Sequence, residues 1–361
     1  MANCQNIISE DFKKIFDFTL YQWFEENRRD FPWRNTQDPY IIWISEIILQ
    51  QTQIKQGYDY FIRFIKRFPT VKSLAEAEET EVLKLWQGLG YYSRARNLYA
   101  SAQLVMNHFN GKFPTEYKDI LSLKGIGKYT AAAIASFAYN QPYAVVDGNV
   151  YRFLARLFAI DEYINTPSGE KLFYDIASQL ISHNQPRLHN QAIMEFGEVC
   201  CTPHQPNCEA CPFANNCLSL ANNTIFDYPQ KKSQTVKRNR YFYYLCFLYK
   251  NNTFIQQRQN KDIWHGLYEF PLIESNKELN DKQLFENEIL QKLNGTIKQR
   301  FKLEKHILSH QNIFGEVLVI EIKDVKNILN KYKLIKNQEI WDFPVSRLIE
   351  KAIFLIKDFE K

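Results

Sequence analysis

One carboxylate stands where it could transfer a proton. Glu46 lies within the apolar run IIWISEIIL, and Pro39 suits the first turn of a helix that we expect to extend to Ile54. In such a helix Gln50 and Gln53 would share a face with Glu46. Burial raises the pKa of a carboxyl group and keeps it protonated, as a general acid requires near neutral pH. The alternative is a structural glutamate that is hydrogen-bonded to its neighbours.

A second carboxylate follows a glycine-containing turn. Gly125 and Gly127 separate an apolar run from an alanine-rich segment, Lys128 to Tyr139, that favours a helix. The glycines permit a sharp turn that places free N–H groups at the start of this helix, where a phosphate can bind. Asp147 then ends an extended run and precedes another helical pattern. The alternative is an ordinary turn between helices, with Asp147 only capping the following helix.

Four cysteines have the spacing of a metal centre. Cys201, Cys208, Cys211 and Cys217 form C-x6-C-x2-C-x5-C within 17 residues. Crowded cysteines in a reducing compartment indicate metal rather than disulfides. Structural zinc sites usually pair two C-x-x-C hooks across a longer spacer, so a cluster held by four thiolates fits this spacing better than zinc. Cys200 is an additional candidate ligand.

The segment GLGYYSRARN, residues 88–97, combines a flexible glycine-containing backbone with two tyrosines and two arginines. Aromatic side chains can wedge between or stack on bases, and arginines can hold phosphates. The alternative is that the two tyrosines pack within the protein beside a turn.

Composition limits the classes of protein. A chain of 361 residues favours two domains, and no apolar run approaches the roughly 20 residues of a membrane span. The N-terminus lacks a basic-then-apolar signal, so we expect a cytosolic protein without a membrane partner. The net charge is about −2 up to Ala221 and about +7 beyond it. DNA affinity would therefore come from local basic patches and backbone amides.

The pattern of the chain changes near residue 240. Helical patterns dominate before it, including an amphipathic segment from about Glu10 to Asn27. Residues 222–240 are a linker with a basic run that is either simply solvated or follows a DNA backbone. Beyond it, YFYYLCFLYK, TFIQQR and EVLVIEI predict strands, with helices at 279–293 and 345–357. We predict a second domain of mixed α and β structure.

Several motifs together resemble the MutY family of adenine DNA glycosylases, within the endonuclease III superfamily. They are FPWR…DPY…WISEIILQQTQ, GLGYYSRARN, the turn from Gly125 to Asp147, and the cysteine spacing. The resemblance runs from about Asp11 to beyond His310. It implies an α+β multidomain protein. An all-α helix-hairpin-helix glycosylase domain would span 1–221, with a six-helix part at about 29–139 and an iron–sulfur part formed by the N-terminal helix and 140–221. A C-terminal α/β Nudix-like domain would span 241–361.

The same resemblance assigns roles to individual residues. Those expected in catalysis are Glu46, which would protonate the adenine, Asp147, which would stabilise the sugar cation, and their partners Tyr129 and Asn149. Those expected to wall the adenine pocket are Trp33, Arg34, Leu49 and Gln191. Those expected to contact DNA or the lesion are Gln51, Thr52, Tyr91, Gly125, Gly127, Lys128, Ser309 and His310. The family places its first cysteine ligand before a Thr-Pro-like pair, which selects Cys201 for one structural [4Fe–4S] cluster.

The chain departs from the family pattern at three positions. Lys124 stands where proline usually precedes the hairpin, and Tyr268 replaces a tryptophan in WHGLYEFP. Leu308 stands where the loop that senses 8-oxoguanine usually has phenylalanine. The acidic metal-binding helix of Nudix hydrolases is absent, so we expect a recognition module rather than a second enzyme.

The implied function is removal of adenine from double-stranded DNA where it is mispaired with 8-oxoguanine or guanine. Relatives that also cut the strand carry a lysine where this chain has Tyr129, so a monofunctional glycosylase is expected. We expect a monomer in the bacterial cytoplasm, associated with the nucleoid. The alternatives are an enzyme for another mismatch, such as thymine opposite guanine, and a non-catalytic DNA-binding protein with a cluster.

Overall fold

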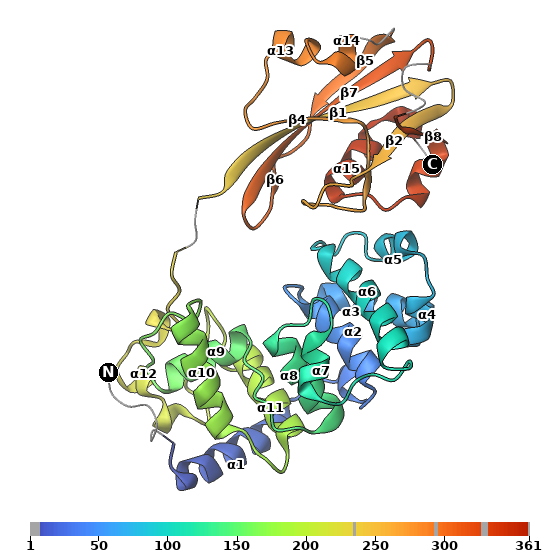
Figure 1. Ribbon diagram of the computed structural model, residues 1–361. Helices are drawn as coiled ribbons and strands as arrows, with labels where there is room; N and C mark the ends of the chain where they lie inside the picture. The colour runs from blue at the N-terminus through green and yellow to red at the C-terminus, as the bar shows by residue number, and fades with distance from the viewer. Residues whose placement is uncertain (1–7, 234–235, 292–294, 326–330, 360–361) are drawn as a thin grey trace. The chain divides into compact units, whose positions relative to one another are not determined.

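The structure is a computed structural model that describes residues 8–233, 236–291, 295–325 and 331–359. The chain divides into two compact units. The first unit comprises Met1–Ala75 with Ala100–Ser233, and the second comprises Glu76–Tyr99 with Gln234–Lys361. The first is helical, and the second combines helices with a β-sheet (Figure 1).

The first unit contains helices that were predicted from the sequence. The segments predicted at 10–27 and 128–139 are helices with those bounds. The α-helices of this unit, with α6 continuing from the second, are α1 (Glu10–Asn27), α2 (Pro39–Leu49), α3 (Ile54–Arg67), α4 (Val71–Ala75), α6 (Ser93–His108), α7 (Tyr117–Ser122), α8 (Lys128–Tyr139), α9 (Gly148–Leu157), α10 (Pro167–Leu180), α11 (Pro186–Val199) and α12 (Leu218–Ala221). Short 3-10 turns are η2 (Pro32–Arg34), η3 (Ala214–Asn216) and η4 (Ile225–Asp227).

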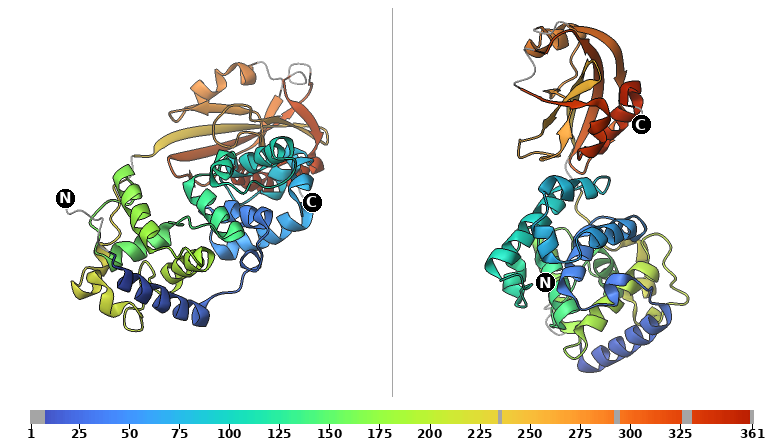
Figure 2. Two further views of the ribbon diagram at one scale, coloured as in Figure 1. Left: turned by 60° about the horizontal axis from the view of Figure 1, so that its bottom comes forward. Right: turned by 90° about the vertical axis from the view of Figure 1, so that its right-hand side faces the viewer.

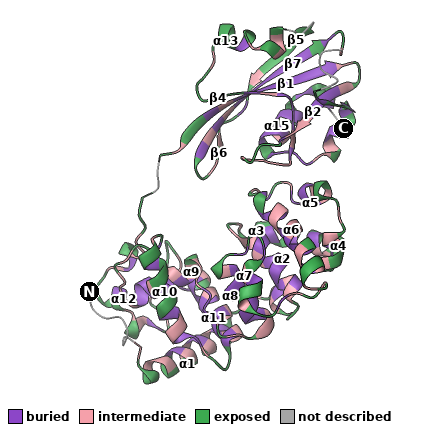
Figure 3. Ribbon diagram, viewed as in Figure 1, coloured by how far each residue is buried: buried purple, intermediate pink, exposed green. Residues whose placement is uncertain are grey.

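Phenylalanines hold α1, α9 and α11 together. Phe16 of α1 and Phe153 of α9 stack with ring centroids 6.1 Å apart, and Phe153 lies 4.6 Å from Phe196 of α11. Phe213, from the cysteine segment, contacts all three rings. All four side chains are buried, and each buried side chain of this size contributes about 1.5–3 kcal/mol. Figure 3 colours the helices by how far their residues are buried. This core fixes α9 and α11, the helices that follow Asp147 and precede the cysteines.

The second unit is built on one sheet with a parallel pair at its centre. β1 (Arg238–Tyr249) pairs in parallel with β7 (Gln311–Ile322), from Arg238 beside Gln311 to Leu248 beside Glu321. Among the described residues the path is β3-β2-β1-β7-β5, with β4 beside β1, β6 beside β7 and β8 beside β2. The other strands are β2 (Asn252–Gln257), β3 (Tyr268–Glu269), β4 (Leu272–Ser275), β5 (Gly295–Lys302), β6 (His306–Ile307) and β8 (Lys333–Lys336).

Both faces of this sheet are covered, as the views in Figure 2 show. Alternate residues of β1 enter opposite cores: Phe242 and Tyr244 pack in one, Tyr243 and Leu245 in the other. The helices of this unit are α5 (Glu79–Leu85), the start of α6, α13 (Asp281–Phe285), α14 (Glu288–Gln291) and α15 (Arg347–Leu355), with 3-10 turns η5 (Asn337–Asp342) and η6 (Lys357–Phe359). α15 packs on the first face and α13 on the second. None of the helices described is long and apolar enough to cross a membrane.

Candidate active site

Glu46 enters the site from α2, a helix that is otherwise mostly buried. Pro39 occupies the first turn, and the Asp38 carboxylate caps the helix by accepting from Tyr40 N at 2.8 Å. The neighbours of Glu46, including Trp43 and Ile47, are buried. The helix ends at Leu49 rather than Ile54, because Gln51 takes a left-handed φ of 52°. Glu46 is therefore carried on a rigid element one turn from that bend.

Tyr129 reaches Glu46 from α8. The preceding turn has Gly125 at a φ of 77°, a left-handed conformation that favours glycine. Gly127 is the N-cap of α8, and no side chain caps it. The Tyr129 side chain acts on Glu46 through hydrogen bonding that lowers the pKa of Glu46. Burial and the nearby charges of Glu46 and Asp147 raise the pKa of Tyr129 well above its ordinary value of 10, so the hydroxyl stays protonated.

Asp147 approaches from the opposite side and caps α9. One carboxylate oxygen, Oδ1, accepts from the backbone N–H groups of Asn149 at 2.9 Å and Val150 at 2.8 Å. The other, Oδ2, accepts from Asn149 Nδ2 at 2.9 Å. Burial raises the pKa of Asp147 above 3.8, and these three hydrogen bonds oppose that rise. The capping role considered from the sequence is thus present, and the same carboxylate also lines the cavity.

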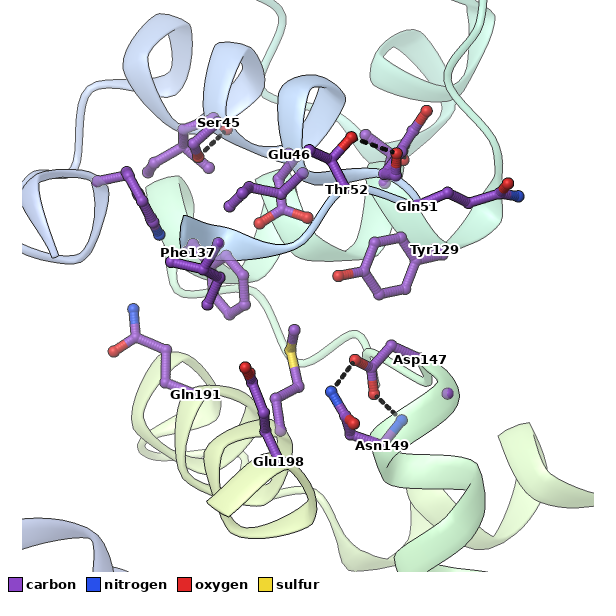
Figure 4. A pocket seen from close by; sticks show the side chains of 18 of the residues that line it. Ser45, Glu46, Gln51, Thr52, Tyr129, Phe137, Asp147, Asn149, Gln191 and Glu198 are labelled. Atoms are coloured by element: carbon purple, nitrogen blue, oxygen red, sulfur yellow. Dashed lines mark hydrogen bonds between the residues drawn. The ribbon is translucent and has the colours of Figure 1, made fainter. Parts of the chain in front are cut away.

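Glu46 and Asp147 share one cavity of about 750 Å³ (Figure 4). Burial raises the pKa of Glu46 to about 7, and the negative charge of Asp147 contributes in the same direction. The Tyr129 hydrogen bond and the charge of Arg34 act the other way. The cavity thus combines a carboxyl group that titrates near neutrality with a carboxylate that is held by N–H donors. Such a pair can divide acid and anion roles.

All of the residues predicted for the adenine pocket and for catalysis line this cavity, with three of those predicted to contact DNA. Those lining it are Trp33, Arg34, Glu46, Leu49, Gln51, Thr52, Gly127, Tyr129, Asp147, Asn149 and Gln191. Trp33 is buried and stacks on Phe31, with the ring centroids 5.0 Å apart. Gln50 and Gln53, predicted to share a helical face with Glu46, also line the cavity, although Gln53 lies beyond the end of α2. Gly125 and Lys128 are exposed beside it in the hairpin, as is Lys124.

The Arg34 wall is fixed by a buried ion-pair network. Arg34 Nη2 lies 2.6 Å from Glu195 Oε2, and Arg29 Nη2 lies 2.7 Å from the same oxygen. The Glu195 side chain has no exposed surface. Burial alone would raise the pKa of Glu195, but the hydrogen bonds from Arg29 and Arg34 outweigh it and lower the pKa to about 2. Arg34 is therefore held by a charged partner and cannot rotate freely.

The predicted metal ligands border a separate, small cavity. Cys201, Cys208, Cys211 and Cys217 line it together with Cys200 and apolar side chains. Arg156 contacts this segment through its guanidinium, with Nη1 3.5 Å from Cys201 Sγ and 2.7 Å from Thr202 O. Thiols around an apolar space with an adjacent cation suit a thiolate-bound cluster. Within the described ranges, no group of three or more His, Cys, Asp or Glu side chains is close enough to hold a single metal ion.

Arg152 lies between the cysteine segment and the catalytic region. Its Nε donates to Cys201 O at 2.7 Å, and its Nη2 donates to Asn149 Oδ1 at 2.9 Å. The same Nη2 also donates to Gly197 O. The amide of Asn149 is thereby oriented, with its oxygen toward Arg152 and its nitrogen toward Asp147.

The remaining predicted contacts belong to the second unit. Tyr91 has a left-handed φ of 48°, is about half exposed, and lies under the Arg94 guanidinium. Ser309 and His310 form the exposed tip of the β6–β7 hairpin, with Ser309 Oγ 3.0 Å from His310 Nδ1. Leu308 packs against the domain core, and Ile307 beside it is 62% exposed. The apolar side chain available at this tip is thus Ile307.

Comparison with known proteins identifies both parts of the chain. Residues 44–176 match the HhH-GPD superfamily of base excision DNA repair proteins, and residues 243–354 match the NUDIX domain. An adenine DNA glycosylase of Buchnera aphidicola (subsp. Baizongia pistaciae) is 37% identical over 337 residues, covering 91% of this chain and 90% of that protein. The chain belongs to the adenine DNA glycosylase family. The family member of Arabidopsis thaliana is 33% identical and covers 89% of this chain and 60% of its own length.

Solved structures agree with this family fold. A thermostable thymine-DNA glycosylase is 32% identical with a TM-score of 0.54, covering 58% of this chain and 97% of its own. An endonuclease III–DNA complex is 19% identical with a TM-score of 0.50, covering 58% of this chain and 97% of its own, and supports the fold alone. The predicted combination of a helix-hairpin-helix domain and a Nudix-like domain is confirmed.

One group of charged residues near the cavity was not predicted from the sequence. Arg29, Glu195 and Glu198 form a charged network beside the cavity, and Glu198 lines it. The available signal was spacing on α11, since Gln191, Met194 and Glu198 fall at i, i+3 and i+7 and all line the cavity. The ion pairs themselves join residues more than 160 positions apart, which no local pattern reveals.

Proposed function

We propose that this protein hydrolyses the N-glycosidic bond of adenine mispaired with 8-oxoguanine or guanine in double-stranded DNA, as a step of base excision repair. The observation that carries the proposal is the single cavity lined by Glu46, Tyr129 and Asp147, in a chain that matches adenine DNA glycosylases along nine-tenths of its length. A base within a duplex cannot reach such a cavity, so the adenine must be flipped out.

The two carboxyl groups would divide the chemistry. Glu46, with a pKa of about 7, donates a proton to a ring nitrogen of adenine, and the base leaves without a developing negative charge. The sugar becomes oxocarbenium-like, and the Asp147 carboxylate stabilises it from the opposite side of the cavity. The N–H groups on Asp147 favour its charged form, and the Tyr129 hydroxyl orients Glu46. Water then adds to the sugar and leaves an abasic site.

The enzyme is proposed to be monofunctional. Strand cutting by related chemistry needs an amine that forms a Schiff base with the sugar. Among the described residues that line the cavity none is a lysine, and Tyr129 occupies the position of the catalytic lysine in bifunctional relatives. Lys128 is exposed at the start of α8, where a cation and free N–H groups suit a DNA phosphate.

Two further parts complete the proposal. Ser309 and His310, at the tip of the β6–β7 hairpin, would hydrogen-bond 8-oxoguanine, and Tyr91, Gln51 and Thr52 would contact the duplex near the lesion. Cys201, Cys208, Cys211 and Cys217 would hold one [4Fe–4S] cluster. A cluster with four thiolate ligands supplies cross-linking rather than redox chemistry in this role. We propose that the protein acts as a monomer.

A second candidate is removal of thymine opposite guanine. The 32% identity to a thymine-DNA glycosylase favours it, but that structure covers 58% of this chain, against 91% for the adenine glycosylase of Buchnera. A duplex with thymine opposite guanine tests this candidate directly.

The first experiment is a single-turnover assay on a labelled duplex with adenine opposite 8-oxoguanine, each sample being split with and without hot alkali. Breaks that appear only after alkali are the expected result. Breaks without alkali would refute the monofunctional assignment. Absence of product while the duplex stays bound would favour a binding protein or another target base. A Glu46→Gln variant should bind the duplex and produce no abasic sites.

A further inference from the structure

A third carboxylate points into the cavity from α11. Glu198 lines the same space as Glu46 and Asp147, and Figure 4 shows its carboxylate directed inward from the helix that also carries Gln191. The side chain is 38% exposed, so one edge is open to the cavity. Neither proton donation nor support of the sugar cation, as assigned above, uses this group.

Arg29 holds Glu198 in place. Its Nη1 lies 3.2 Å from Glu198 Oε1, and its Nη2 lies 2.9 Å from Glu198 Oε2. Arg29 is itself fixed by Glu195, through Nε at 2.7 Å and the backbone N–H at 3.0 Å. A guanidinium held on two sides orients the Glu198 carboxylate. Each carboxylate oxygen has further lone pairs that can accept a hydrogen bond from a ligand.

The chemistry of this group determines what it can bind. A carboxylate in the cavity repels phosphates and the carbonyl oxygens of bases, and it attracts N–H donors. Adenine within a DNA strand offers one such donor group, the exocyclic amine, because its other polar atoms on the base are acceptors. We propose that Glu198 is a specificity residue, which accepts a hydrogen bond from the exocyclic amine of the flipped adenine. The inference rests on the proposed function.

Guanine and thymine would fit this arrangement poorly. Where adenine carries the amine, guanine and thymine carry a carbonyl oxygen, which would face the carboxylate. A site that hydrogen-bonds a substrate N–H group binds an analogue without it less well, since that hydrogen bond is then lost. Glu198 would therefore help the residues that line the pocket to select adenine over guanine and thymine, while Glu46 and Asp147 carry out the reaction.

The test compares two target bases opposite 8-oxoguanine: adenine, and purine, which lacks the exocyclic amine. Single-turnover rate constants are measured for the wild type, Glu198→Ala, Glu198→Gln and the control Glu25→Gln, which changes an exposed carboxylate on α1. We expect Glu198→Ala to lower the adenine rate constant about tenfold and to leave the purine rate constant nearly unchanged. Glu198→Gln, whose amide oxygen can still accept, should fall between, and Glu25→Gln should match the wild type. Melting temperatures of all four proteins report whether each variant is folded.

The decisive quantity is the ratio of the rate constant for adenine removal to that for purine removal. A fall of equal size on adenine and purine would overturn the inference, because it would place Glu198 on the sugar cation or in support of Arg29. An unchanged ratio with unchanged rates would overturn it as well. If the wild type removes neither base, the proposed function fails. If the wild type removes adenine and the ratio does not move, only the role of Glu198 fails.

Discussion

Replacing Tyr129 with phenylalanine should shift the pH dependence of base removal toward alkaline pH. Burial and the charge of Asp147 raise the pKa of Glu46 to about 7, and hydrogen bonding by the Tyr129 side chain opposes this rise. The variant keeps the ring and removes only the hydroxyl. The pKa of Glu46 should therefore rise, and Glu46 should stay protonated to higher pH.

The size of the shift follows from the strength of the hydrogen bond. A hydrogen bond to a charged group contributes about 1.5–3 kcal/mol, and one pH unit corresponds to about 1.4 kcal/mol, so the lower end of this range gives a shift of about one unit. With a pKa of about 7, roughly one-tenth of wild-type Glu46 is protonated at pH 8. The variant would be about half protonated there. Any loss of rate relative to the wild type should thus be about fivefold smaller at pH 8 than at pH 6.

The assay is the single-turnover rate constant on the duplex with adenine opposite 8-oxoguanine, measured from pH 5 to 9 with enzyme in excess. Tyr163→Phe is the control, because Tyr163 is 44% exposed and does not line the cavity. The wild type should lose activity as pH rises through about 7, when Glu46 loses its proton. A variant profile with an unchanged or more acidic midpoint would refute the assignment of Glu46 as the proton donor oriented by Tyr129.

Three other predictions concern stability, lesion sensing and the cysteines. The folded-state pKa of Glu195 is about 2, so its contribution to stability is present above its ordinary pKa of 4.5 and is lost as pH falls through 2. Glu195→Gln should lower the free energy of unfolding at pH 7, measured in urea, by about 3 kcal/mol. The variant should also show a weaker dependence of stability on acid pH. Ile307→Ala should reduce the preference for 8-oxoguanine over guanine opposite adenine about tenfold, because Ile307 is exposed at the hairpin. Leu308→Ala should mainly lower the melting temperature, because Leu308 packs against the core. The reverse result would refute a role of Ile307, rather than Leu308, in contacting the lesion. Iron analysis should find the cluster lost in Cys201→Ser and retained in Cys200→Ser, and iron loss in both would add Cys200 to the ligands.

Local patterns predicted the elements that carry the site. The apolar run that begins at Pro39 correctly predicted the helix that carries Glu46. Proline at a helix start and apolar spacing are local signals that involve only one or two helical turns. The prediction that this helix continues to Ile54 was wrong. Its end depends on the left-handed backbone at Gln51, a residue type that does not itself signal a turn. The glutamines beyond the bend still reach the cavity, by a route that helical periodicity does not describe.

Contacts between residues that are far apart in the chain could not be predicted from local sequence patterns. The sequence predicted Arg34 as a pocket wall only through resemblance, and the reason it can serve as one is Glu195, which lies 161 positions away. The hairpin at Leu308 illustrates the same limit. The sequence has an apolar residue at the position expected to contact the lesion. In the structure that residue, Leu308, follows the end of β6 and packs against the core, whereas Ile307, the last residue of β6, is exposed.

The capping and catalytic interpretations of Asp147 describe one arrangement. A carboxylate buried beside Glu46 would tend to take up a proton, and two neutral carboxyl groups could not stabilise a sugar cation. Placing Asp147 at the N-cap of α9 gives it two backbone N–H donors and the Asn149 amide, all of which favour the anion. Glu46 has no such donors from a helix start, since it lies in the middle of α2. The position of each carboxylate relative to its helix therefore explains why burial raises the pKa of Glu46 to about 7, whereas three N–H donors oppose the same rise at Asp147.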